Sequence, residues 1–472
     1  MTEELVEEGS GKALNPEQQA SEEQDAASRP RDVITVVLTA DNHLGAAAGQ
    51  PMRRREERAR QLRHAFQQAV DFAIGQGVDL FVQAGDLFDT LNPAEHERSF
   101  VAERLVQLRQ AGVRTFMVGG LRDTPPLGRA LAEGALPAPQ LSFARLGALH
   151  YFEPLSLPPR PSVPLAAGVG LGGGQPLVEL TPALCEIDGL RVGLCGLSVR
   201  AGQEGDPLAC VRPAAEFERA QIRILILHAP IEGLSDEPAS VETQALVSRS
   251  TLARQTAFQY ILAGYHHAFQ HLRLGQCELI VAGPTQHIDF NDPADSEPGF
   301  VFLGLASDGV RWCKHIAVET VRLRRLIVPT SDLWPASPAE ARSGETGAAS
   351  SPTAVILERL RPLCNQQTMV QLKLEGELTR QQYHQLDLNQ IRRYGEQSAF
   401  SLAIDDTALT LLPDDHEAAV AAGPAEAAER FSPREELAAL ADEWIAAASD
   451  EQEKKALLVT KEVLLNALDE IH

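Results

Sequence analysis

Residues 33–43 read VITVVLTADNH, an apolar run that ends in an aspartate and a histidine. The run from Val33 to Ala40 has the length and the β-branched composition of a buried strand. Side chains two residues apart share a face of an extended chain, so Asp41 and His43 can reach one metal ion. Carboxylate oxygen and imidazole nitrogen are common ligands of divalent metals. This stretch therefore predicts a strand with metal ligands at its carboxyl end.

Four further apolar runs end in the same way. They are Val78–Ala84, Val113–Val118, Ile222–Leu227 and Tyr260–Ala263. The polar segments that follow them are Gly85-Asp86-Leu87-Phe88-Asp89, Gly119-Gly120-Leu121-Arg122-Asp123, His228 and Gly264-Tyr265-His266-His267. Open α/β sheets place their sites outside the carboxyl ends of the strands. We therefore expect the five strand ends to meet at one metal site.

The order of these segments resembles the calcineurin-like metallophosphoesterases, and within them the SbcD-type DNA repair exonucleases. The pattern of that family is D-x-H, G-D-x-x-D, G-N-H-D, a lone histidine and G-H-x-H. Residues 282–290 and Pro298-Gly299-Phe300 are similar to the segment after the family's last metal histidines. The resemblance covers roughly residues 33–412. It implies an α/β fold of two facing β-sheets flanked by helices, with a small α+β capping domain and C-terminal helices.

Carried over residue by residue, the resemblance implies one complete Mn²⁺ site and one incomplete site. The residues that would hold the first metal are Asp41, His43, Asp86 and His267. The second metal would use Asp86 and His228, but Leu121 and Tyr265 stand where the family has asparagine and histidine. Leucine offers no ligand atom, and tyrosine ligates only as a phenolate. His266 is an alternative ligand, although it belongs to the opposite face of its strand from His267.

Arg122 stands where the family has its catalytic histidine. An arginine stays protonated and cannot shuttle a proton, but it can clamp a phosphate. The other interpretations of Arg122 are an exposed loop residue or a salt bridge to Asp123. His228 has a second interpretation as a pocket histidine bonded to backbone. For Asp89 and Asp123 we expect a supporting role, in capping loops or holding the ligands.

The bulk properties exclude some functions. The 472 residues carry a net charge of −23, which disfavours autonomous tight binding to DNA. No apolar run reaches the ~18 residues of a membrane span. The first residues, Met-Thr-Glu-Glu, do not resemble a secretory signal, and the six cysteines are scattered without a C-x-x-C pair. We therefore expect a cytoplasmic protein with reduced thiols and no membrane association.

A basic cluster follows the first ligand loop. It contains Arg53, Arg54, Arg55, Arg58, Arg60 and Arg63. These side chains could meet the phosphate backbone of DNA near the metal site. The alternative is a solvated helix face on which the arginines pair with Glu56 and Glu57.

Composition shifts divide the chain. We expect a disordered acidic tail at 1–32, a body at 33–330, linkers at 331–352 and 413–431, a small α+β unit at 353–412 and a helical tail at 432–472. The resemblance implies that the body is the metallophosphoesterase domain and that the small unit is a DNA-clamp-like capping domain. Helices are expected at 53–75 and 93–111, and Asp-Gly pairs at 188–189 and 308–309 predict β-hairpins. In the capping domain we expect helices at 353–363 and 379–394 and strands at 369–378 and 399–404. The stretch 158–175 is expected to be a surface loop.

The resemblance also implies partners. The amphipathic helices of residues 432–472 would dock on an SbcC-type coiled-coil ATPase, or alternatively pack on the body or self-associate. A homodimer is implied as well. Three functions remain open. They are an SbcD-like subunit of a DNA double-strand-break repair complex with impaired nuclease activity, an active Mn²⁺-dependent DNA exonuclease or endonuclease, and a small-molecule phosphoesterase.

Overall fold

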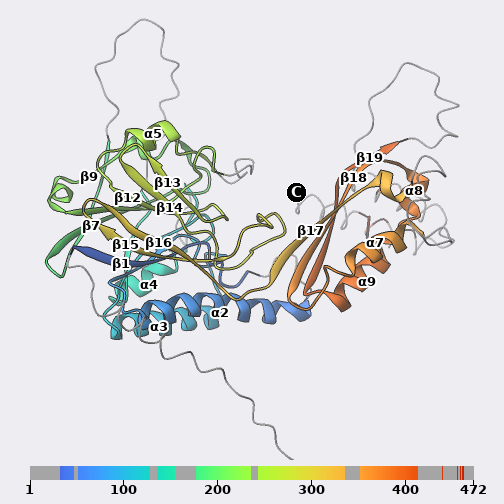
Figure 1. The fold of residues 1–472 in the computed structure, drawn as a ribbon, viewed down its shortest axis with the longest axis horizontal. Coiled ribbons are helices and arrows are strands. Elements are labelled where there is room, and N and C mark those ends of the chain that lie inside the picture. The colour runs from blue at the N-terminus through green and yellow to red at the C-terminus, as the bar shows by residue number, and fades with distance from the viewer. Residues whose placement is uncertain are drawn as a thin grey trace, which may run out of the picture. The chain divides into compact units, whose positions relative to one another are not determined.

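A computed structural model (Figure 1) describes residues 32–46, 52–127, 136–155, 177–234, 243–334 and 351–412, with isolated positions between 438 and 461. The chain divides into two compact units, residues 1–322 and 323–472. Several expectations lie outside the described residues. They concern the acidic tail up to residue 31, the loop 158–175, residues 335–350 of the first linker, the second linker and the C-terminal helices.

The first unit is built on two six-stranded sheets that face each other. One sheet has the order β16-β15-β1-β2-β3-β4 and the other β13-β14-β12-β10-β7-β6. The first comprises β1 (Val33–Thr39), β2 (Leu80–Ala84), β3 (Arg114–Val118), β4 (His150–Phe152), β15 (Gly299–Ala306) and β16 (Gly309–Ala317). The second comprises β6 (Ala183–Ile187), β7 (Leu190–Ser198), β10 (Ile222–His228), β12 (Tyr260–Gly264), β13 (Gln270–Leu274) and β14 (Cys277–Val281). The expected α/β fold of two facing sheets flanked by helices is confirmed.

The central strands are mostly apolar because both of their faces are covered. In β1, Ile34, Val36 and Leu38 belong to the core between the sheets, whereas Val37 packs in the outer core with the helices. Parallel sheets buried on both faces typically show such continuous apolar runs. The pairs β1–β2, β2–β3 and β10–β12 are parallel, so the carboxyl ends of these strands lie at one edge of each sheet.

Helices cover the outer faces of both sheets. The first sheet packs against α2 (Met52–Gly75), α3 (Glu95–Gln110) and α4 (Gln140–Arg145), and the second against α5 (Arg249–Arg254) and the 3₁₀ turns η1 (Leu208–Cys210) and η2 (Ala215–Arg219). Two small ladders pair β5 (Val178–Leu180) with β9 (Val211–Pro213), and β8 (Glu204–Gly205) with β11 (Gln244–Ala245). No helix of the described residues has the length and apolar character needed to cross a membrane.

Both Asp-Gly hairpins are confirmed. The first joins β6 to β7 in an antiparallel pair, and the second joins β15 to β16. Asp188 and Gly189 have φ angles of 48° and 85°. Positive φ at both central residues is the geometry that favours Asp-Gly in a two-residue hairpin turn.

The second unit is a three-stranded sheet with helices on one face. It comprises β17 (Arg322–Pro329), β18 (Thr368–Thr379), β19 (Ser401–Leu412), α6 (Thr330–Leu333), α7 (Pro352–Leu360), α8 (Arg380–His384) and α9 (Leu388–Ser398). Because β17 pairs with β18, the boundary between the units falls at residue 322 instead of the expected 330. The expected single helix at 379–394 is wrong. Thr379 and Gln382 form a capping box that starts α8, and Asp387 starts α9 by accepting a hydrogen bond from the Gln390 amide.

We predict that Ile224→Ala destabilises the first unit by about 2–5 kcal/mol, because it leaves a cavity in the core between the sheets. Ile224 is fully buried there. Urea denaturation followed by circular dichroism measures the change. Leu146→Ala is the matched control, since 77% of the Leu146 side chain is exposed, and it should change the free energy of unfolding by less than about 0.5 kcal/mol. Equal effects would contradict the placement of Ile224.

Candidate metal centre

The loops after β1 and β2 pair with each other beyond the ends of the strands. The Asp41 amide donates to the Gly85 carbonyl at 3.0 Å, and the His43 amide donates to the Asp86 carbonyl at 3.0 Å. Asp41, His43 and Asp86 have φ angles of 48°, 44° and 51°. Non-glycine residues with this left-handed backbone are uncommon and gather at functional sites. The paired loops thus hold three expected ligands in an unusual conformation.

The five expected ligand side chains meet at this edge. Asp41, His43 and His267 form one group whose ligand atoms all lie within 4.8 Å of one another, and Asp41, Asp86 and His228 form a second such group. The Asp86 Oδ2 atom lies 3.7 Å from His43 Nε2 and 3.4 Å from His228 Nε2. Asp41 is therefore common to both groups, and Asp86 lies between two of the imidazoles.

All three imidazoles are anchored through Nδ1. His43 Nδ1 lies 2.9 Å from Asp89 Oδ1, His228 Nδ1 lies 2.8 Å from the Ala84 carbonyl oxygen, and His267 Nδ1 lies 2.6 Å from Asp292 Oδ1. An oxygen acceptor at Nδ1 places the proton there and leaves Nε2 as a lone-pair donor. The Nε2 atoms of His43 and His228 are buried and have no hydrogen-bond partner. Orphaned imidazole nitrogens beside two carboxylates fit a divalent metal ion.

The electrostatics of the cluster follow from burial and proximity. Burial raises the pKa of Asp41 above its ordinary value, against the opposing charges of His228 and His267. Burial alone would also raise the pKa of Asp86, but His228, His43 and the Arg122 amide together outweigh the burial and hold this pKa below its usual range. The pKa of His228 rises to about 9, because Asp86 and Asp41 outweigh its burial. Two carboxylates in a buried space thus create a demand for positive charge.

Glycines give the ligands room. A Cβ atom on Gly85, which has a φ of 94°, would lie 2.2 Å from His228 Nδ1. A Cβ atom on Gly120 would lie 2.1 Å from Asp86 Oδ1. The Asp86 Oδ1 atom also accepts a hydrogen bond from the Arg122 amide at 2.8 Å. The close approaches of Gly85 to His228 and of Gly120 to Asp86 therefore require glycine, which has no side chain.

A buried polar network, which sequence reasoning missed, supports the loops from below. The Asn42 amide group donates to Thr39 Oγ1 and to Thr285 Oγ1 at 2.8 and 3.1 Å. Gln83 Nε2 donates to Asn42 Oδ1 and to the Gly85 carbonyl, and Gln83 Oε1 accepts from the Gly85 amide. Polar residues such as Thr39 and Gln83 near the ends of otherwise apolar strands could have indicated this network from the sequence.

The two positions at which we expected the second metal to have lost its ligands are Leu121 and Tyr265. Leu121 packs against the outer core of the second sheet. The Tyr265 amide donates to both oxygens of Asp41, and the Tyr265 ring meets the His228 ring edge-on at 5.7 Å. His266 does not join either ligand group, because its Nε2 accepts a hydrogen bond from the Ile231 amide at 2.9 Å.

Arg122 and Asp123 are adjacent but have different surroundings. Arg122 is exposed, whereas Asp123 is fully buried. The Asp123 carboxylate accepts hydrogen bonds from the amides of Gly120 and Phe88 and from the Gln140 side chain. Burial and the charge of Asp86 raise the pKa of Asp123 to about 7. Asp123 and Asp89 thus have the supporting contacts expected of them, one to loop amides and the other to His43.

The arginines of α2 are largely engaged within the protein. Arg54 pairs with Glu57 at 2.6 Å, and Arg63 pairs with Glu56 at 3.0 Å and with buried Glu97 at 2.5 Å. Arg55 is exposed, and the side chain of Arg53 lies outside the described residues.

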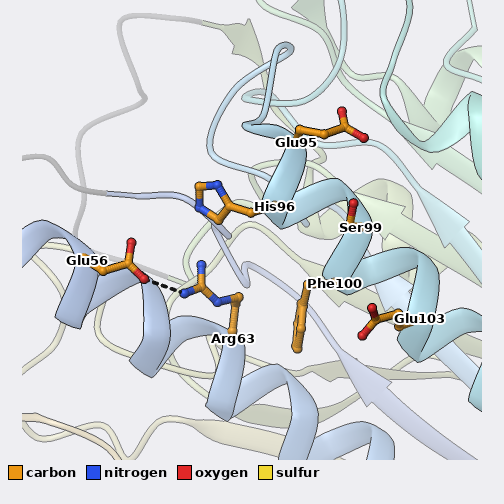
Figure 2. A pocket seen from close by; sticks show the side chains of 7 residues that line it. All are labelled: Glu56, Arg63, Glu95, His96, Ser99, Phe100 and Glu103. Carbon is orange, nitrogen blue, oxygen red and sulfur yellow. Dashed lines mark hydrogen bonds and ion pairs between the residues drawn. The ribbon is translucent and has the colours of Figure 1, made fainter.

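Figure 2 shows Arg63 beside a pocket between α2 and α3. Its lining also includes the side chains of Glu56, Glu95 and Glu103. Because these carboxylates outnumber the cations, the pocket is a poor site for a phosphate backbone.

No family model matches the chain. Over 93 residues the chain is 28% identical to the DNA double-strand break repair protein Mre11 of Saccharolobus solfataricus. The matched stretch is 20% of this chain and 23% of that protein. The crystal structure of a putative 5'-nucleotidase from Staphylococcus aureus in complex with alpha-ketoglutarate matches with a TM-score of 0.32 and 14% identity. That match covers 61% of this chain and 54% of the nucleotidase.

We predict that Mn²⁺ stabilises the protein. At 100 times its dissociation constant it should add about 2.7 kcal/mol to the free energy of unfolding, since only the folded chain assembles the ligands. A thermal shift assay with Mn²⁺, followed by excess EDTA, measures the rise and its reversal. His43→Ala should abolish the rise, and His271→Ala, outside the cluster, should retain it. The same rise in His43→Ala would argue against this centre.

We also predict that Gly85→Ala weakens Mn²⁺ binding by about tenfold or more, because the new methyl group displaces His228. Gly112→Ala is the matched control. Gly112 has a comparable φ of 81° but open space around its Cα, so it shares the backbone strain without the clash. Isothermal titration calorimetry compares the two variants. Equal Mn²⁺ affinities would mean that the His228 position does not matter for the metal.

Proposed function

We propose that this chain is a metallophosphoesterase-class subunit of a DNA double-strand-break repair and end-processing complex, similar to the SbcD-type proteins. In this proposal one metal is retained and nuclease activity is impaired or lost. The observation that carries it is that Asp41, His43, Asp86, His228 and His267 form two ligand groups, whereas Leu121, at the position of a family ligand, has no donor atom and packs against an apolar core. The 93-residue similarity to a DNA break repair protein supports the DNA-related role.

The retained site suits one divalent ion such as Mn²⁺. Asp41, His43, Asp86 and His267 would hold it, and His228 lies within reach of Asp86. Such an ion acts as a Lewis acid that polarises a phosphoryl oxygen. The protein's own contribution is to orient the ligands through Asp89, Ala84 and Asp292 and to bury the cluster away from bulk water.

The impairment follows from what two-metal hydrolysis needs. Two ions roughly 3.5–4 Å apart clamp the attacking and the leaving oxygens, and a positioned acid or base typically contributes about 10²–10⁴-fold in rate. Leu121 and Tyr265 supply none of the neutral ligands expected for a second ion. Arg122 is exposed and permanently charged, so it can bind a phosphate but cannot transfer a proton.

Two other functions compete with this proposal. An active one-metal DNA nuclease would use the same ligands with Arg122 on the phosphate. A small-molecule phosphoesterase has no need of a separate three-stranded unit, so the second unit favours a larger substrate. We further propose a cytoplasmic homodimer whose C-terminal segment, residues 432–472, binds an SbcC-type coiled-coil ATPase.

The test is Mn²⁺-dependent cleavage of linear duplex DNA by the purified full chain. We expect no cleavage by the parent protein and cleavage by Leu121→Asn/Arg122→His/Tyr265→His, because these changes restore two ligands and a proton-transfer group. Asp41→Ala in the triple variant should remove the activity again, which excludes a contaminating nuclease. Cleavage by the parent that disappears in Asp41→Ala would establish the active nuclease instead.

A further inference from the structure

The last expected ligand, His267, is hydrogen-bonded to a buried carboxylate that no sequence pattern indicated. Asp292 is 1% exposed, and its Oδ1 lies 2.6 Å from His267 Nδ1. Its second oxygen accepts a hydrogen bond from the Ile288 amide. Both oxygens are therefore engaged, and the carboxylate has a fixed orientation. Ser296 Oγ also donates to the His267 carbonyl, so the segment that carries Asp292 contacts His267 at two points.

The segment that carries Asp292 is tied to helix α2 by a buried arginine. Arg58 is 1% exposed, and its Nη1 donates to Gln286 Oε1 at 2.5 Å while its Nη2 donates to the His287 carbonyl. Gln286 Nε2 in turn donates to the Gln61 carbonyl at 2.9 Å. Burial lowers the pKa of the Arg58 guanidinium to about 10, and the negative charge of Asp292 partly offsets this effect. A buried arginine needs such compensation, since an unpaired buried charge is strongly destabilising.

We propose that Asp292 is the positioning residue of His267. It fixes the imidazole in the tautomer whose Nε2 faces Asp41 and His43, and Arg58 keeps Asp292 in place by fastening residues 286–287 to α2. Carboxylates that bind metal-ligating histidines set the ring orientation and raise ligand basicity. The inference rests on the metal site of the proposed function, not on DNA cleavage.

Asp292 differs from the carboxylate that supports His43. The Asp89 side chain is 31% exposed, so water competes with the His43 imidazole for hydrogen bonds to its carboxylate. The Asp292 side chain is only 1% exposed. A charge-assisted hydrogen bond in a dry environment holds its partner more strongly. We therefore expect His267 to depend on its carboxylate more than His43 does.

Asp292→Asn is the decisive variant because the Ile288 amide fixes the orientation of the new side chain. The Asn oxygen must accept the hydrogen bond from Ile288, so the Asn NH₂ group faces His267 Nδ1. His267 Nδ1 must then accept a hydrogen bond, and the proton moves to Nε2, the atom meant for the metal. We expect Mn²⁺ affinity to fall about 10–100-fold. The melting temperature of the metal-free protein should also fall, because the variant loses the charge that compensates the buried Arg58.

The first measurement is the tautomer of His267 in the metal-free full chain. Nitrogen-15 spectra of histidine-labelled protein distinguish Nδ1–H from Nε2–H, and His267→Gln assigns the signal. We expect Nδ1–H in the parent and Nε2–H in Asp292→Asn. An unchanged tautomer overturns the proposal, even in a protein that binds no metal, so this result is separate from failure of the proposed function.

The second measurement is Mn²⁺ affinity by isothermal titration calorimetry. Glu278→Gln is the matched control, because Glu278 contacts His271 at 3.1 Å in a pair outside the cluster. It should leave Mn²⁺ affinity unchanged. Arg58→Lys keeps the charge but loses the fork that reaches Gln286 and His287 together. We expect it to lower Mn²⁺ affinity several-fold, about 3–10-fold, without moving the His267 proton. Parent-like affinity in Arg58→Lys overturns the role of Arg58, and parent-like affinity in Asp292→Asn overturns that of Asp292.

Discussion

The metal centre depends on the pairing of two loops beyond the strands that carry them. The bonds from the Asp41 amide to Gly85 and from the His43 amide to Asp86 extend the β1–β2 ladder into residues with left-handed backbone. Each such residue costs about 1–3 kcal/mol unless the surroundings impose the conformation. The buried network around Asn42 supplies that constraint. Without this network the carboxylates of Asp41 and Asp86 would not point into the same space, and the histidines would have no carboxylates near their Nε2 atoms.

The strands and the ligands could be predicted from the sequence because burial imposes a clear hydrophobic pattern on it. Strands covered on both faces are apolar throughout, so polar residues at their carboxyl ends stand out. Asp41, Asp86 and His228 were found in this way, and the structure brings them together. The second unit was harder to predict, because the break between α8 and α9 depends on the new helix start at Asp387, which caps α9.

The groups that orient the ligands were not accessible in the same way. Asp292 lies 25 residues after His267 in a polar loop, and no spacing rule connects an imidazole with its supporting carboxylate. The arginines of α2 gave a misleading impression of uniformity. Arg58 is buried and bonds to Gln286, Arg54 pairs with Glu57, and Arg55 is exposed. A cluster of like charges in the sequence thus separates in the fold into structural and exposed members, which composition alone cannot distinguish.

The charges of the centre connect its geometry with its affinity for a divalent ion. Asp41 and Asp86 carry two negative charges, and imidazoles that donate from Nδ1 and ligate through Nε2 are neutral, so one divalent ion balances the site. The exposed Arg122, whose amide binds Asp86, adds a positive charge beside the centre. A permanently charged guanidinium can bind a phosphate but cannot transfer a proton.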